Sequence, residues 1–75
     1  MRKQATEQTT EQAQAIVNGE DLTGYELAKR VSEAGFPIRA QHVYNLFPQS
    51  RRNEAGQVDA EKATKWLAGF LANKA

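Results

Sequence analysis

Apolar residues recur at helical spacing in four stretches of the chain, and polar segments that contain glycine or proline separate these stretches. The spacing predicts helices over residues 7–18, 24–34, 39–47 and 60–74. The predicted fold is therefore all-α, a small helix-turn-helix bundle of about four helices. Residues 49–57 form either a short wing or a plain loop.

The first predicted helix follows a polar, low-complexity segment, of which residues 1–6 are expected to be flexible. Asn18 and Gly19 end this helix, because both residues tolerate the left-handed backbone conformation. Its apolar face consists of Ala13, Ile16 and Val17.

The second helix has the best-marked start in the sequence. The Thr23 hydroxyl can accept a hydrogen bond from the Glu26 amide while the Glu26 carboxylate reaches back, as in a capping box. Leu22 and Leu27 are placed to form a hydrophobic staple, and Gly35 ends the helix. The apolar stripe consists of Leu27, Ala28, Val31 and Ala34.

The third helix is short and has a polar outer face. At 100° per residue its inward arc consists of Ala40, Val43, Leu46 and Phe47, with Tyr44 at the border. Gln41, His42 and Asn45 face outward. Amide side chains match the major-groove edge of adenine, and Arg39 at the helix start can contact guanine or phosphate. Residues 23–47, which contain the second and third predicted helices, therefore have the pattern of a helix-turn-helix motif.

The last part of the chain completes the predicted core. Residues 49–57 hold the adjacent pair Arg51 and Arg52, and Asp59 is a good N-cap for the fourth helix. An exposed part of the fourth helix could serve as a dimer interface or a partner groove. Its apolar stripe consists of Ala63, Trp66, Leu67, Phe70 and Leu71.

Composition limits the classes of function. Seventy-five residues allow one domain, residues 1–75, and the absence of cysteine fits a cytoplasmic home. We expect no membrane contact, since no apolar run approaches the roughly 20 residues of a membrane span. His42 is the only histidine, and Glu20 and Asp21 are expected in a solvated loop. We therefore expect no enzyme activity, metal, cofactor or small-molecule substrate.

Positive charge gathers in the middle of the chain although the net charge is only +1. Residues 1–21 carry −2, residues 22–53 carry +3 and residues 54–75 are balanced. A phosphate-facing surface requires such a concentration. The basic residues of the middle segment are Lys29, Arg30, Arg39, Arg51 and Arg52.

The segments GYELAKRVSEAG, PIRAQHVYN and GQVDAEKATKWLAGFL resemble small actinobacterial and phage-type helix-turn-helix proteins, of the excisionase and terminase-small-subunit class of winged helices. The resemblance covers residues 24–71 and implies a helix docked in the major groove of double-stranded DNA. It implies groove contacts from Arg39, Gln41, His42 and Asn45, and phosphate contacts from Arg51 and Arg52. Lys29 and Thr23 complete the candidate DNA-binding set.

The sequence leaves alternatives open for both the helical motif and the function. Ala28 and Val43 are 15 residues apart, a longer connection than in compact repressor-type motifs, which favours a looser variant or a plain helical hairpin. A DNA-binding regulator would act by occupancy as a homodimer or cooperative array. The alternative is a small adaptor or inhibitor that binds a protein through the Trp66 and Phe70 helix. A toxin or antitoxin component is a third interpretation.

Overall fold

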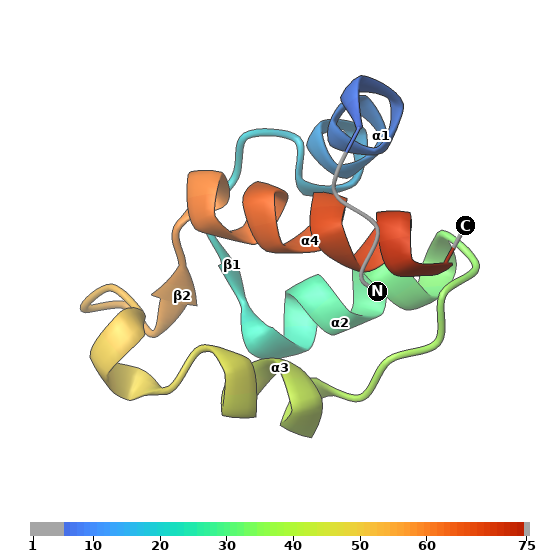
Figure 1. Ribbon diagram of the computed structural model, residues 1–75. Coiled ribbons are helices and arrows are strands. Elements are labelled where there is room, and N and C mark those ends of the chain that lie inside the picture. The colour runs from blue at the N-terminus through green and yellow to red at the C-terminus, as the bar shows by residue number, and fades with distance from the viewer. Residues whose placement is uncertain (1–5, 75) are drawn as a thin grey trace.

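The computed structural model describes residues 6–74, which form four α-helices and one short two-stranded sheet (Figure 1). The elements in chain order are α1 (Glu7–Val17), β1 (Leu22–Thr23), α2 (Gly24–Glu33), α3 (Ala40–Leu46), a 3₁₀ turn η1 (Gln49–Arg51), β2 (Gln57–Val58) and α4 (Ala60–Lys74). The prediction of an all-α bundle of four helices is confirmed, with each helix in its expected place along the chain.

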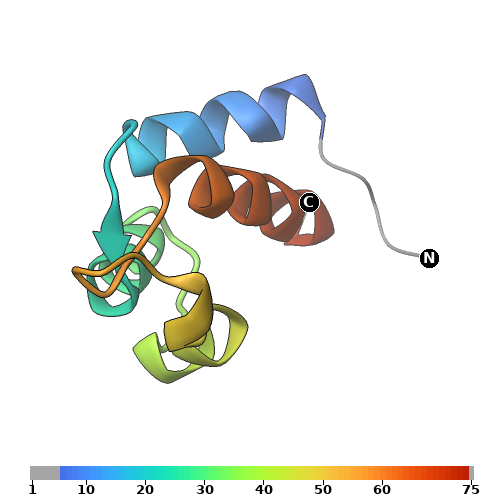
Figure 2. The same cartoon turned by 90° about the vertical axis from the view of Figure 1, so that its left-hand side faces the viewer.

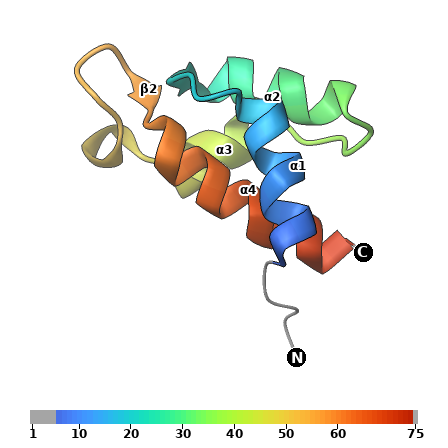
Figure 3. The ribbon, with the colours of Figure 1, turned by 90° about the horizontal axis from the view of Figure 1, so that it is seen from above.

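Helix α1 lies against α4, on the side of α4 that faces away from α3 (Figures 2 and 3). It begins with a capping box in which Thr6 and Thr9 each accept a hydrogen bond from the other's amide. Thr6, expected at the end of a flexible segment, is thus the N-cap of this helix, and residues 1–5 lie outside the described residues. The predicted stop is confirmed, since Asn18 adopts the left-handed conformation with φ of +57°.

Arg30 joins α2 to the end of α1. Its guanidinium donates to the carbonyl oxygens of Ile16 and Val17, at 3.3 and 3.1 Å, and pairs with the carboxylate of Glu20. A cation at a helix C-terminus satisfies carbonyls that have no partner within the helix. The charge of Arg30 therefore serves this junction and does not add to the expected phosphate-facing surface.

Both ends of α2 are closed by local hydrogen bonds. The Thr23 hydroxyl accepts from the Glu26 amide at 3.1 Å, as predicted, but the Glu26 carboxylate accepts from that hydroxyl rather than reaching the Thr23 amide. At the other end Gly35 has φ of +100° and Phe36 donates to the Val31 carbonyl, which is a Schellman motif. Ala34 is exposed, contrary to the predicted stripe, because it lies beyond the last helical residue.

The segment from residue 49 to residue 57 is not a hairpin wing. It consists of η1, a tight turn in which Asn53 bonds to Gln57 and Gly56, and strand β2. β2 pairs antiparallel with β1, in the register Leu22 to Val58. The partner strand β1 lies directly before α2, so the pair fixes the end of this segment to the start of α2.

Two carboxylates cap α4. Asp59 accepts from the amides of Glu61 and Lys62, and Asp21 accepts from the amide of Ala60 at 2.9 Å. Asp21 lies exposed in the loop between α1 and β1, as expected, and its role as a cap of α4 was not predicted. None of the helices within residues 6–74 is both long and apolar enough to cross a membrane.

One hydrophobic core joins the four helices and both strands. The predicted inward residues Val17, Leu27, Val31, Val43 and Leu67 are fully buried. Trp66 and Phe70, expected in the core, pack at its edge and are only partly buried. The other buried members of the core are Ala13, Leu22, Ala28, Phe47, Val58, Ala63, Ala68 and Leu71.

Candidate nucleic-acid interface

Helix α3 returns beneath α2 and is held to it at both ends (Figure 1). Near the turn, the Ser32 hydroxyl accepts from the Ile38 amide and donates to the Ile38 carbonyl, both at 3.3 Å. At the far end, the Tyr25 amide donates to the Tyr44 hydroxyl at 3.3 Å. Because the first-turn amides of a helix have no partner within the helix, Tyr44 serves as a second cap for α2. The longer connection between the two helices is therefore fixed by side chains.

Aromatic side chains of α4 hold the segments on either side of α3. The ring of Phe36, before α3, packs edge-on against Phe70 at 6.4 Å between centroids. The ring of Phe47, after α3, packs edge-on against Trp66 at 6.0 Å. Trp66 and Phe70 lie 5.4 Å apart, so the four rings form a continuous row. Such pairs contribute about 0.5–1.5 kcal/mol each beyond the area they bury.

The outer face of α3 is polar and accessible. Gln41, His42 and Asn45 are all exposed, as the sequence predicted. The Gln41 amide donates to the Asn45 side-chain oxygen at 3.1 Å, one helical turn along. Arg39 occupies the N-cap position without using its side chain as a cap, and it is exposed. These four side chains line one groove together with Phe70 and Lys74 of α4.

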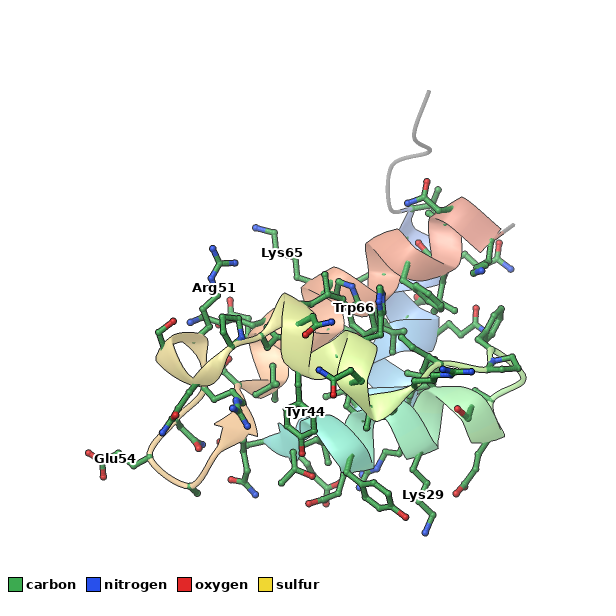
Figure 4. The ribbon with its side chains drawn as sticks, turned by 90° about the horizontal axis from the view of Figure 1, so that it is seen from below. Lys29, Tyr44, Arg51, Glu54, Lys65 and Trp66 are labelled. Carbon is green, nitrogen blue, oxygen red and sulfur yellow. The ribbon has the colours of Figure 1, made fainter. Side chains whose placement is uncertain are left out.

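Basic side chains flank α3 on both sides (Figure 4). Lys29 projects from α2 on one side, beside a groove that it lines with Tyr25 and Ala40. Arg51 and Lys65 project on the opposite side, from η1 and α4. Helix α3 is thus a polar ridge with one cation, Lys29, on one flank and two cations, Arg51 and Lys65, on the other.

Two of the predicted site residues are used inside the fold. The Arg52 guanidinium lies over the Tyr44 ring at 4.8 Å from its centroid, and its buried Nε has no hydrogen-bond partner. The Thr23 hydroxyl both accepts from and donates to Glu26. The structure therefore brings Arg39, Gln41, His42 and Asn45 together along one groove, which Arg52 and Thr23 do not line. Contacts of Arg52 and Thr23 with DNA stay predictions.

Three basic residues of α4 were not among the predicted site residues. Lys62 and Lys65 lie near Arg51, and Lys74 lies near Arg39. The helical pattern alone places Lys62 and Lys65 on the outer face of the fourth helix. Their proximity to Arg51 depends on how η1 packs against α4, for which the sequence has no local signal.

Within the described residues, no group of three or more histidine, cysteine, aspartate or glutamate side chains is placed to hold a metal ion.

No family model matches this chain, and neither a curated protein nor a solved structure matches it.

Proposed function

We propose that this protein binds double-stranded DNA in a sequence-specific manner, inserts α3 into the major groove, and acts by occupancy as a regulatory or accessory factor. The observation that carries this proposal is the polar ridge of α3 with cations on both flanks. The major groove is about 12 Å wide and admits one α-helix, and phosphates line both of its edges. A ridge of this kind therefore complements the groove and its two backbones.

The residues of the ridge have the chemistry that base reading requires. Gln41 and Asn45 are joined by one hydrogen bond, which orients both amides on the exposed face. An amide can bond to N6 and N7 of adenine, and an arginine can bond to O6 and N7 of guanine. Arg39 at the helix start is the candidate for guanine or phosphate, and Lys29 and Arg51 are candidates for the flanking backbones.

The test is binding of fluorescein-labelled duplexes, followed by anisotropy, after selection of a preferred sequence from a pool with a randomised centre. We expect Arg39→Ala, and separately Gln41→Ala with Asn45→Ala, to weaken binding to the selected duplex by about 1–3 kcal/mol for each base that is no longer read. Gln12→Ala on the exposed face of α1 is the matched control and should have no effect. Absence of binding to any duplex at low salt would contradict the proposal.

The alternative of a protein-interaction module gains less support. It requires exposed apolar side chains on α4, but Trp66 and Phe70 pack against Phe47 and Phe36. Among the described residues the large exposed hydrophobic side chain is that of Tyr25, on α2. Self-association on DNA and a toxin or antitoxin role stay predictions.

A further inference from the structure

We propose that a second groove, between η1 and α4, binds the phosphodiester backbone of the DNA that α3 reads; this inference rests on the proposed function. Three basic residues line the groove, and no acidic residue does. The groove is lined by Leu46, Phe47, Arg51, Lys62, Lys65 and Trp66. Three cations beside an apolar wall focus positive potential, and phosphate is the matching ligand.

No carboxylate among the described residues forms an ion pair within 4.0 Å with a cation of this groove. Within the part of the chain that the structure describes, the ion pair within 4.0 Å joins Arg30 to Glu20, and neither residue lines the groove. Glu61 precedes Lys65 by one helical turn and lines with it another groove, between α1 and α4, but the two side chains do not form an ion pair within 4.0 Å. Arg51, Lys62 and Lys65 are all exposed. Their positive charge is therefore available to an anion.

The position of the groove suits one backbone at the edge of the major groove. Arg51 and Lys65 lie along the flank of α3 opposite Lys29 (Figure 4). Leu46 and Phe47, at the end of α3, form part of the groove wall. When α3 contacts the bases, the DNA strand at this edge of the major groove would therefore pass along this wall. Lys29 would meet the other backbone, so that one protomer spans both edges of the major groove.

The test uses the full chain with Lys62→Gln and Lys65→Gln, two exposed changes on the outer face of α4. The matched control is Gln8→Glu with Gln12→Glu, which alters net charge by the same amount on exposed positions of α1. Dissociation constants are measured for the selected and an unrelated duplex at salt concentrations from about 50 to 200 mM. We expect the lysine variant to weaken binding to both duplexes by the same factor. Its log–log salt slope should become shallower by about 0.9 for each phosphate that is no longer neutralised.

A second measurement reports whether bound DNA covers the groove. Trp66 is the only tryptophan in the chain and lines this groove, so its quenching by iodide at constant ionic strength reports access there. We expect bound duplex to reduce iodide quenching in the unchanged protein and to reduce it less in the lysine variant.

Two outcomes would overturn the inference, and they differ from each other. If the lysine variant behaves like the α1 control while Arg39→Ala still weakens selected binding, the groove is not a backbone site and the proposed function stands. If the unchanged protein binds no duplex at low salt, the proposed function fails and the inference fails with it.

Discussion

The contact between Gly24 and Tyr44 sets the approach of α3 to α2. A Cβ atom at position 24 would lie 2.7 Å from Cε1 of the Tyr44 ring, closer than side chains pack. The same ring carries the hydroxyl that caps α2 and lies beneath the Arg52 guanidinium. Three interactions therefore depend on the Tyr44 ring: its close contact with Gly24, the hydrogen bond from the Tyr25 amide and the Arg52 guanidinium above it. The ring fits in this position because Gly24 has no side chain.

We expect Gly24→Ala to lower the free energy of unfolding by about 1–3 kcal/mol, because the added methyl group overpacks this contact. With Tyr44→Ala in the background the same change should be neutral or stabilising by up to about 1 kcal/mol, since Gly24 does not have a positive φ and alanine loses less backbone entropy on folding. Urea denaturation of the four proteins of this cycle provides the measurement. Equal costs in both backgrounds would show that the ring does not set this approach.

At the level of the element, α4 begins where two distant parts of the chain meet. Asp59 caps it from the preceding residue, and Asp21 caps it from the loop between α1 and β1. The adjacent pairing of Leu22 with Val58 brings Asp21 to this position. The start of α4 thus ties the first helix, the sheet and the last helix together.

Removal of the Asp21 carboxylate should destabilise the protein by about 0.5–2 kcal/mol, the usual cost of removing an N-terminal cap. Asp21→Ala removes the acceptor, whereas Asp21→Asn keeps an oxygen and should cost less. Thermal unfolding followed by circular dichroism compares the two variants. An equal destabilisation in both variants would assign the effect to charge and not to the hydrogen bond.

The helices were predictable where local residues mark them. Thr23, Asn18 and Gly35 specify helix ends through their own backbone and side-chain chemistry, and each acts as the sequence indicated. The cap by Asp21 and the neighbourhood of Lys62 and Arg51 were not predictable, because they join residues that only packing brings together.

The same distinction holds for the candidate site. The outward direction of Gln41, His42 and Asn45 follows from helical periodicity and was predicted correctly. The position of Arg52 over the Tyr44 ring is a tertiary contact, which a basic pair in a polar segment does not reveal. The pairing of β2 with β1 likewise joins Val58 to Leu22, which is distant along the chain.

The whole molecule has an uneven distribution of charge. Residues 6–21, which include α1, carry four acidic and no basic side chains, whereas residues 22–74 carry eight basic and five acidic ones. Helix α1, with Glu7 and Glu11, lies on the far side of α4 from α3 (Figure 2), whereas Glu20 pairs with Arg30 of α2. A polyanion is therefore attracted to the α3 side, although the net charge is only +1.

A heteronuclear NMR titration with duplex DNA tests whether α3 and the groove between η1 and α4 form a DNA-binding surface. The amide signals of residues 40–46, Arg51, Lys62 and Lys65 should shift most. The signals of α1, from Glu7 to Val17, should change little. Shifts centred on α1, or no shifts with any duplex at low salt, would contradict the account.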